Sequence, residues 1–376
     1  MEIDISALIH NIRETKRVIS SETQIMAIVK ADGYGHGALA VGRIFVENGA
    51  SCLGVATIEE GCQLRKSGIK VPILILGHTE PGQVDAVIAD SISQTISTWE
   101  QAVILSGRAV ALSRPVTIHI KIDTGMGRLG FLPDGESMAA IARIMSLPGL
   151  SVEGIFTHFA TSDSADKTYT QKQWHQFSSF LNHLEQNKIH VPLKHAANSA
   201  AIINHPQTHI DMVRAGIMLY GLYPSPDTND GRVNLRPAMT LKARVSHVKE
   251  VEPGTGLSYG ITYITSNRQR IATLPIGYAD GFSSVFSNNA DAIIHGQKVP
   301  VVGRICMDQC LLDVTGIKTD VLMGDEVVLL GKQGEHQISA DQWANRLGTI
   351  NYEVVTRFGP RISKKYIADF RESDLT

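Results

Sequence analysis

The pattern of apolar positions divides the chain into two parts. Through about residue 230, short runs rich in β-branched apolar residues alternate with longer segments that have helical periodicity. This alternation is typical of repeated βα units around a parallel sheet. We recognise eight such runs, at residues 25–29, 52–56, 73–76, 91–96, 116–122, 151–157, 193–196 and 210–214. Eight units in this length predict a (β/α)8 barrel of the TIM type.

The pattern changes at Pro237, after which we predict strands separated by glycine-containing turns. The expected strands are residues 241–248, 269–274, 292–294, 299–302, 311–314 and 326–330. Residues 229–236 are polar and have no periodicity, so we place the boundary there. The predicted fold is α/β, with residues 1–235 forming the barrel and residues 236–376 forming a mostly β C-terminal domain.

The composition is that of an ordinary folded protein and argues against two classes of partner. The chain has 376 residues, of which 43% are apolar and 19% charged, so it can bury a large core. Its formal net charge is −2 and no dense run of lysine and arginine is present, which argues against nucleic acid. The longest apolar stretches, such as residues 73–76 and 327–330, are far shorter than the roughly 20 residues that span a bilayer. We expect neither nucleic acid nor a membrane as a partner.

The start of the chain and its cysteines predict a cytoplasmic protein. Met1 is followed by Glu2, Ile3 and Asp4, without the basic and apolar regions of a secretory signal. The four cysteines form two distant pairs whose spacing matches neither a zinc site nor a dense disulfide framework: Cys52, Cys62, Cys306 and Cys310. We expect reduced thiols and no bound metal.

The first predicted barrel strand leads directly into Lys30 and a loop with three glycines, residues 31–37. Active-site side chains gather at the C-terminal ends of barrel strands, and a partly desolvated lysine there can attack a carbonyl carbon. Lys30 is therefore a candidate for covalent catalysis, although a lysine that merely extends its amine into solvent would have the same position. The glycines would let the backbone approach a ligand, and Tyr34 could donate its hydroxyl to a phosphate.

Later strands also end in polar residues. Lys121, Asp123 and Arg128 surround the end of the fifth run, a cluster that suits an anionic ligand but is explained equally well by an ion-paired barrel rim. Arg214 ends the eighth run, and the amides of Gly216 and Ile217 follow it where TIM barrels commonly hold phosphate. The remaining candidates are His158 after the sixth run and Asn198 and Ser199 after the seventh. Together these strand ends favour a site over separate structural roles.

The second part of the chain contains polar groups between glycines and apolar strands, at residues 256–260 and 303–309. From the residues alone, each segment is more typical of a β-turn than of a site, because Gly, Ser and Asp are also the ordinary turn residues.

The whole chain resembles the bacterial alanine racemases through six motifs, whose order and spacing extend over both predicted domains. They are residues 30–37 (KADGYGHG), 123–130 (DTGMGRLG), 258–260 (SYG), 275–281 (PIGYADG), 303–309 (GRICMDQ) and 351–353 (NYE). The resemblance implies an enzyme that uses pyridoxal 5′-phosphate to interconvert L-alanine and D-alanine and so supplies D-alanine for bacterial peptidoglycan. It also implies a head-to-tail homodimer in which each β domain completes the active site of its partner.

The same resemblance implies roles for individual residues. Lys30 would carry the cofactor and act as the base on one face of the substrate, and Tyr259 of the other subunit would act on the second face. His158 and Arg214 would form a polar relay behind that tyrosine, and Arg214 would also face the pyridine nitrogen of the cofactor. Since arginine keeps its proton, the ring nitrogen would stay unprotonated, which would suppress transamination.

The other implied roles concern binding. Lys121 matches a position that is often carbamylated in the family, and Arg128 would contact the phenolic oxygen of the cofactor. The substrate carboxylate would lie near Arg128, Met307 and Asp308. Asn198 belongs to the same cofactor-binding set, and the implied phosphate ligands are Tyr34, Ser199, the amides of Gly216 and Ile217, and Tyr352.

Three alternatives remain from the sequence. A related amino-acid decarboxylase would use a cysteine of the β domain, for which Cys306 is the candidate, but Tyr259 and Arg214 favour racemisation. A non-catalytic cofactor-binding protein would share the barrel and the lysine but would have no second domain, so residues 237–376 argue against it. A serine or broad-spectrum racemase would need room for only one more hydroxyl, which a small pocket rejects poorly. Tyr352 is bulky at a position where serine-preferring relatives tend to be smaller, so alanine is the preferred substrate.

Overall fold

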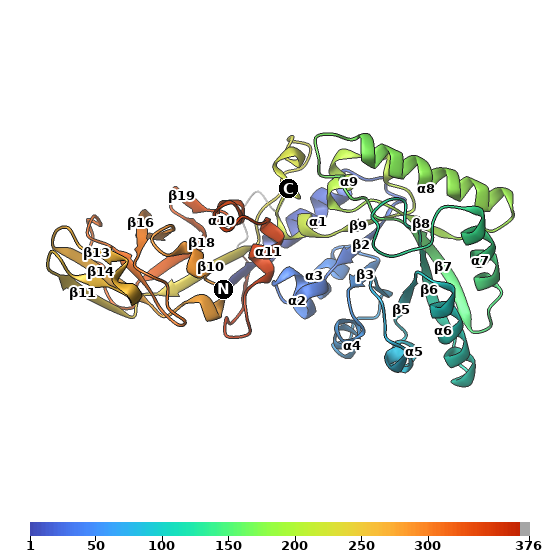
Figure 1. Cartoon of the computed structure of the whole chain (residues 1–376), viewed down its shortest axis with the longest axis horizontal. Helices are drawn as coiled ribbons and strands as arrows, with labels where there is room; N and C mark the ends of the chain where they lie inside the picture. Colours follow the sequence, from blue (N-terminus) through green and yellow to red (C-terminus); the bar gives the residue numbers. More distant parts are fainter. Residues whose placement is uncertain (369–376) are drawn as a thin grey trace. The chain divides into compact units, whose positions relative to one another are not determined.

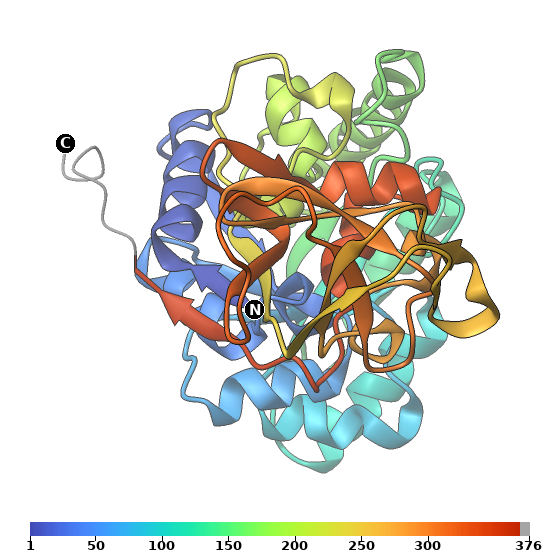
Figure 2. The same ribbon diagram turned by 90° about the vertical axis from the view of Figure 1, so that its left-hand side faces the viewer.

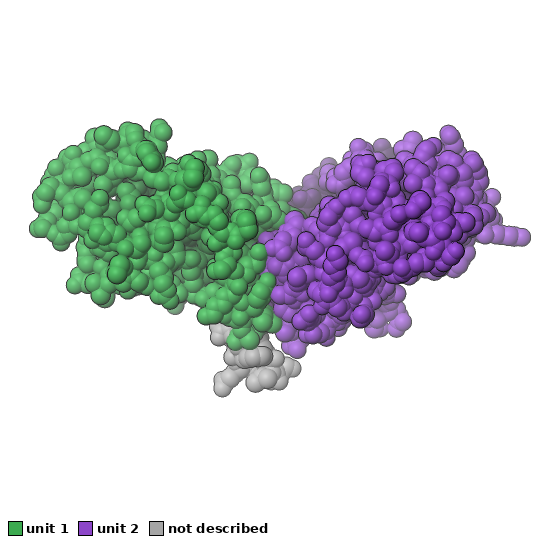
Figure 3. Space-filling view, turned by 90° about the horizontal axis from the view of Figure 1, so that it is seen from below, with its two compact units in different colours: residues 1–6, 237–376 green, residues 7–236 purple. Residues whose placement is uncertain are grey.

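The computed structural model describes residues 1–368 and divides into two compact units (Figure 3). One unit is Ala7–Arg236, and the other combines Met1–Ser6 with the chain from Pro237 onward. The end of the predicted second domain, residues 369–376, lies outside the described residues.

The unit formed by residues 7–236 contains a closed barrel of parallel strands in the order β2 to β9. The eight strands predicted from the sequence are confirmed: β2 (Gln24–Ile28), β3 (Cys52–Val55), β4 (Ile73–Ile75), β5 (Ser93–Ile96), β6 (Val116–Lys121), β7 (Leu150–Phe156), β8 (Leu193–His195) and β9 (Met212–Ala215). Their β-branched and apolar side chains are largely buried, as expected for strands covered on both faces. The predicted (β/α)8 fold is therefore confirmed.

Helices follow the strands and lie outside them, as Figure 1 shows for α4 to α8. The helices of this part of the chain are α1 (Ile5–Arg17), α2 (Lys30–Tyr34), α3 (Ala38–Glu47), α4 (Ile58–Lys66), α5 (Val84–Ala89), α6 (Trp99–Ala111), α7 (Gly135–Met145), α8 (Thr168–Gln186) and α9 (Ser199–Asn204). Short 3-10 turns are η1 (Pro81–Gln83), η2 (Pro206–Thr208), η3 (Ile217–Tyr220) and η4 (Pro226–Thr228). In residues 1–368, no helix is both long and apolar enough to cross a membrane.

The other unit is built on a ten-stranded sheet in the order β11-β14-β17-β16-β15-β18-β10-β1-β20, with β19 paired to β18. Figure 2 shows its strands from residue 239 onward in yellow, gold, orange and red. They are β1 (Glu2–Asp4), β10 (Met239–Arg244), β11 (His247–Val251), β14 (Gln269–Leu274), β15 (Asp291–Ile294), β16 (Gln297–Val302), β17 (Cys310–Asp313), β18 (Glu326–Gln333), β19 (His336–Ile338) and β20 (Lys365–Ile367). A separate hairpin consists of β12 (Gly256–Leu257) and β13 (Tyr263–Ile264). The predicted mostly β architecture is confirmed.

One predicted strand of this unit is wrong in its extent. Residues 241–248 were expected to be continuous, but they are divided between β10 and β11. The two strands have different neighbours, because β10 pairs with β18 whereas β11 pairs with β14. The Val245 amide leaves both ladders and donates to Asp325 O at 2.9 Å. The apolar residues continue through residues 241–248, so the sequence pattern did not indicate that the strand changes its pairing partner there.

The sequence pattern also gave no indication of the helices in this unit, α10 (Ala340–Leu347) and α11 (Asn351–Thr356). Trp343 of α10 is buried, with ring centroids 5.4 Å from Phe282 and 4.7 Å from Phe286. The helix is thus fixed by tertiary aromatic packing. The remaining 3-10 turns are η5 (Tyr259–Ile261), η6 (Tyr278–Asp280) and η7 (Ser284–Phe286).

The first residues of the chain differ from the predicted domain boundary, which put them in the barrel. Strand β1 pairs antiparallel with β10 and parallel with β20, so Met1–Ser6 belong to the unit with the large sheet. Ile3 of this strand is fully buried. A three-residue strand whose partners lie more than 200 residues away has no local signature in the sequence.

Candidate active site

The barrel brings the predicted polar residues to one rim. Lys30 follows β2, Lys121 is the last residue of β6, and His158 comes two residues after β7. Ser199 begins α9 after β8, and Arg214 lies near the end of β9. Because the strands are parallel and the barrel is closed, all these C-terminal ends lie at the same end of this unit.

The residues after Lys30 form a left-handed turn that is rare for L-amino acids. Ala31, Asp32, Gly33 and Tyr34 have φ values of 52°, 52°, 62° and 51°. Each non-glycine residue in this region costs about 1–2 kcal/mol, so such a run persists only where other contacts hold it. Backbone bonds within the turn include Gly33 N to Val29 O at 2.8 Å and Gly35 N to Ala31 O at 2.9 Å.

Two carboxylates hold this turn in place. Glu60 Oε1 accepts the Ala31 amide at 2.7 Å, and Glu60 Oε2 accepts the Ala56 amide at the end of β3, also at 2.7 Å. Asp32 Oδ1 accepts the amide of Ala38, the first residue of α3, at 2.9 Å. The left-handed turn thus orients Lys30 from a rigid strand end. Sequence reasoning missed Glu60; its signal was only the ordinary capping pattern of Thr57 and Glu60 at the start of α4.

The rim is strongly cationic. Burial lowers the pKa of Lys30, and the nearby Arg128 guanidinium lowers it further. Burial is also the main cause that lowers the pKa of His158, followed by the charges of Arg214 and Lys121. Neighbouring cations thus contribute to the lowered pKa values of Lys30 and His158, because several of them share one end of the barrel. An anionic ligand would relieve this repulsion, which favours a phosphate-bearing molecule here.

Arg214 belongs to this cluster and is buried. Its Nη2 donates to Thr157 O at 2.8 Å and to Ala196 O at 2.9 Å. The same nitrogen is 3.1 Å from His158 Nδ1. Burial lowers the pKa of Arg214 to about 9, which still leaves the guanidinium protonated at neutral pH. Arg214 therefore provides a fixed positive charge that cannot act as a base there.

Tyr34, Ser199 and Gly216 converge on one small space. The Gly216 amide donates to Ser199 Oγ at 2.9 Å. A β-carbon at Gly216 would lie 3.0 Å from Tyr34 Oη and 3.5 Å from Ser199 Oγ, so only glycine leaves this space open. Asn198 caps α9 by accepting the Ala201 amide at 3.0 Å, which places Ser199 at the first helical position. Two hydroxyls beside the Gly216–Ile217 amides are groups of the kind that bind a phosphate.

Lys121 has an unusual environment for a lysine. Its amine is buried, and within residues 1–368 Nζ has no hydrogen-bond partner. The nitrogen lies 4.7 Å from the centroid of the Phe156 ring. Burial lowers the pKa of Lys121 well below its ordinary value, and the charges of Arg214 and Arg128 contribute. Burial and the neighbouring cations therefore favour the neutral form of this amine, which is the form that can be modified covalently.

The predicted residues of the other unit lie on adjacent loops. Tyr259 begins η5 after Ser258, whose Oγ donates to Arg304 O at 2.5 Å. The Tyr278 amide donates to Cys306 O at 3.1 Å, so the loops at residues 258–261, 277–280 and 303–309 are neighbours. Tyr259 is 72% exposed and Met307 is 52% exposed. Such exposed apolar side chains on adjoining loops are typical of an interaction surface.

Three further predicted residues lie in this unit. Asp308 Oδ1 pairs with Arg361 Nη2 at 2.8 Å. Tyr352 is half-buried on α11. Cys306 is a free thiol with its Sγ 3.5 Å from Ser258 Oγ.

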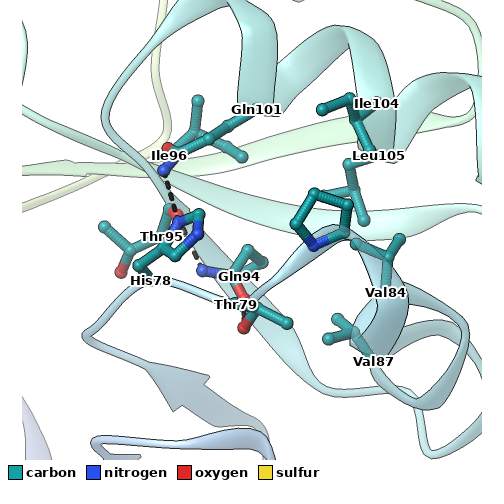
Figure 4. Close-up of a pocket in the computed structure, with 11 residues that line it drawn as sticks. His78, Thr79, Val84, Val87, Gln94, Thr95, Ile96, Gln101, Ile104 and Leu105 are labelled. Atoms are coloured by element: carbon teal, nitrogen blue, oxygen red, sulfur yellow. Dashed lines mark hydrogen bonds between the residues drawn. The ribbon is translucent and has the colours of Figure 1, made fainter.

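A cavity in the barrel unit contains none of the predicted residues. It lies beside β5, η1, α5 and α6, and His78, Gln101, Val84 and Leu105 line it (Figure 4). His78 Nδ1 lies 2.8 Å from Gln101 Nε2 at its edge. Its volume of about 30 Å³ is far below the roughly 150 Å³ of a cavity that binds benzene, so it is too small for the cofactor.

Comparisons with known proteins match both units. A family described as alanine racemase, N-terminal domain, matches residues 3–224, and one described as alanine racemase, C-terminal domain, matches residues 238–366. An alanine racemase of Methanococcus maripaludis is 49% identical over 97% of this chain and 98% of that protein. One of Clostridium perfringens is 48% identical over 97% of this chain and 94% of that protein.

A solved structure agrees with these sequence matches. The alanine racemase of Clostridium difficile superimposes with a TM-score of 0.94 at 41% identity, covering 98% of this chain and 95% of that chain. The similarity therefore extends over both units.

Proposed function

Because the chain belongs to the alanine racemase family and catalyses the interconversion of L-alanine and D-alanine, we propose that Lys30 and Tyr259 are its two bases. The observation that carries this proposal is the position of Lys30, which is held at a barrel strand end by a left-handed turn beside a cluster of cations. Racemisation requires proton transfer at both faces of the α-carbon, and a lysine amine and a tyrosine hydroxyl are suitable groups.

The family uses pyridoxal 5′-phosphate, and we propose that the barrel rim holds it. When bound, this cofactor delocalises the negative charge that forms on the substrate α-carbon. Lys30 Nζ would attach it covalently, and Arg128 would contact its phenolic oxygen. The proposed phosphate ligands are Tyr34, Ser199, the amides of Gly216 and Ile217, and Tyr352, with Asn198 positioning Ser199. The cationic rim and the open space at Gly216 support this assignment.

Each base must lose its own proton before it can accept the α-proton of the substrate, and different neighbours favour that loss in each case. Burial and the Arg128 charge lower the pKa of Lys30, which makes its neutral amine more accessible at neutral pH. Tyr259 must lose its proton to act as a base. His158 lies 3.1 Å from Arg214, and we propose that this pair stabilises the phenolate when Tyr259 approaches.

Arg214 would also set which reaction occurs. We propose that it faces the pyridine nitrogen of the cofactor as a permanent donor. Since its guanidinium keeps its proton at neutral pH, the ring nitrogen cannot be protonated by this residue. A donor that keeps its proton would limit the negative charge that a bound cofactor takes up on its ring, which would favour reprotonation at the α-carbon over transamination.

We propose that the enzyme is a homodimer in which Tyr259 of each subunit completes the other site. The support is the exposed apolar surface on the adjoining loops of residues 258–261, 277–280 and 303–309. The proposed substrate carboxylate site near Met307 and Asp308 lies on the same loops and would be completed by Arg128 of the partner subunit. An amino acid would thus be enclosed between surfaces of two chains.

Lys121 is proposed to be carbamylated. Its neutral amine would add to carbon dioxide and release a proton, giving a carbamate that faces Arg128 and lowers the excess positive charge. With ¹³C-labelled bicarbonate, we expect a carbamate carbon signal that the Lys121→Arg variant lacks. If wild type and variant give the same spectrum, Lys121 is not modified.

The biological role and location are also proposals. We infer that the enzyme works in the cytoplasm and supplies D-alanine for peptidoglycan. All four cysteines are unpaired, which is typical of a reducing compartment.

The activity is tested by incubating the protein, loaded with pyridoxal phosphate, with L-alanine in heavy water. We expect D-alanine that carries deuterium at the α-carbon, measured by chiral chromatography and mass spectrometry. Loss of alanine with appearance of an amine would instead indicate decarboxylation and draw attention to Cys306. Faster turnover of serine than of alanine would contradict the substrate assignment.

The phosphate cradle predicts the effect of Gly216→Ala. The added β-carbon would lie 3.0 Å from Tyr34 Oη, so the cradle must open or lose its ligand. We expect the Kd for pyridoxal phosphate to rise at least about tenfold, measured by fluorescence titration. Gly107→Ala in α6 is the control, because a β-carbon there meets no atom within 4 Å. Equal affinity of the two variants would place the phosphate elsewhere.

A further inference from the structure

A continuous series of hydrogen bonds runs through the barrel unit to Arg214. Glu153 Oε2 lies 3.1 Å from His119 Nε2, and His119 Nδ1 lies 3.0 Å from His195 Nε2. His195 Nδ1 then lies 3.0 Å from Arg214 Nη1, and Arg214 Nη2 reaches His158 Nδ1 at 3.1 Å. The residues come from β6, β7, β8 and β9 and connect a half-exposed carboxylate to a buried guanidinium.

The strands are shaped to accommodate this series. The register between β6 and β7 shifts between Ile118 and His119, so that His119 is paired with Gly154. A β-carbon at Gly154 would lie 2.2 Å from His119 Nδ1, so only glycine lets the ring take this place. The His195 ring stacks on Phe156 at 4.6 Å with an interplanar angle of 8°, which fixes its orientation.

The chemistry of the end groups dictates the direction of every hydrogen bond. Arginine can only donate, so His195 Nδ1 must accept and its proton must lie on Nε2. That proton goes to His119 Nδ1, which leaves the His119 proton on Nε2. Glu153, as a carboxylate, accepts it. Both imidazoles are thus neutral and carry the same tautomer, and burial lowers the pKa of His195, as do the charges of Arg214 and Lys121.

We propose that Glu153 and His119 are positioning residues that act on the reaction through His195 and Arg214. By fixing both tautomers, the carboxylate keeps His195 Nδ1 free to accept from Arg214 and so holds the guanidinium in its direction. If His195 carried its proton on Nδ1, two donors would face each other and Arg214 would have to turn. Among residues 1–368, the structure gives Arg214 no direct carboxylate partner, so Glu153 is the anionic end of its network.

This inference rests on the proposed role of Arg214, but its first test does not depend on activity. In the ¹⁵N-histidine-labelled full chain loaded with pyridoxal phosphate, we expect long-range ¹H–¹⁵N NMR to show His119 and His195 as neutral Nε2–H tautomers. The signals are assigned with the His119→Asn and His195→Asn variants. A proton on Nδ1 of either ring, or a doubly protonated ring at neutral pH, would overturn the series.

The second test removes only the charge of Glu153. The amide in Glu153→Gln can donate as well as accept, so we expect a second tautomer of His119 to be populated. We also expect kcat for alanine to fall about tenfold with KM little changed, since a tenfold change corresponds to ~1.4 kcal/mol, the size of one hydrogen bond to a charged group. The side chain of Glu153 is 42% exposed, so the variant should fold, and its thermal unfolding provides the check.

The matched control is Glu185→Gln, which changes an exposed carboxylate 3.1 Å from His190 Nδ1 outside the series. This variant should alter the His190 signal alone and leave turnover unchanged. If Glu153→Gln matches wild type in both its His119 tautomer and kcat, Glu153 has no positioning role. If wild type has the expected tautomers but does not racemise alanine, the proposed function fails while the hydrogen-bond directions stand.

Discussion

Replacing Lys30 with alanine should abolish racemisation and the covalent attachment of the cofactor together. The amine at the end of β2 is the proposed attachment point and also one of the two bases, so one substitution removes both. General-base catalysis alone contributes about 10²–10⁴-fold, and we expect kcat to fall by at least about 10⁴-fold. The visible absorbance of lysine-linked pyridoxal phosphate should disappear, and borohydride should no longer fix the cofactor to the protein.

The control for this substitution is Lys194→Ala, which removes a partly buried lysine of strand β8. Lys194 Nζ lies 3.6 Å from Glu185 and has no part in the proposed site. Its variant should keep full activity and the bound cofactor. Borohydride fixation that persists in Lys30→Ala would show that a different lysine carries the cofactor.

Much of the barrel and its rim could be predicted from the sequence because the signals are local. Each barrel strand is a short, largely apolar run, and several of these runs have a polar residue at or just after their C-terminal end. Lys30, His158 and Arg214 were found in this way. Active sites form at the C-terminal ends of parallel barrel strands. This rule predicts that these residues lie together, without knowledge of any contact between them.

The groups that sequence reasoning missed depend on contacts between distant segments. Glu60 reads locally as a helix-capping residue, and only the fold brings its second oxygen to the amide of Ala31. His119 and His195 are isolated histidines 76 positions apart, and neither has a motif around it. Residues that support a site through other residues therefore have weak local signals, whereas residues at strand ends have strong ones.

The predicted strand bounds of the second unit, and its predicted start, were wrong for a related reason. The sequence predicted one strand at residues 241–248 because apolar residues continue through it. The ladder changes partners at Val245, and that change is determined by β14 and β18 rather than by the local residues. Strand β1 likewise joins this unit through partners at the far end of the chain.

Replacing Tyr259 with phenylalanine should separate proton exchange from inversion. The variant keeps the ring but loses Oη, so one face of the α-carbon has no base. We expect racemisation to fall about 10²–10⁴-fold while cofactor binding is kept. In heavy water, the enantiomer whose α-proton faces Lys30 should still exchange that proton without changing configuration. Tyr263→Phe, which loses a hydroxyl 2.9 Å from Gln269 Nε2, is the control and should keep normal turnover.

The two variants also test whether the site is shared between subunits. If Tyr259 acts in the partner's site, a dimer of one Lys30→Ala chain and one Tyr259→Phe chain contains one complete site and one site lacking both bases. Random reassociation of equal amounts gives half mixed dimers, so activity should return to about a quarter of wild type. Each variant alone should have at most about 1% of wild-type activity, so a recovered rate near a quarter is specific to mixed dimers. If mixing restores nothing while subunit exchange is confirmed by mass spectrometry, Lys30 and Tyr259 of one chain serve the same site.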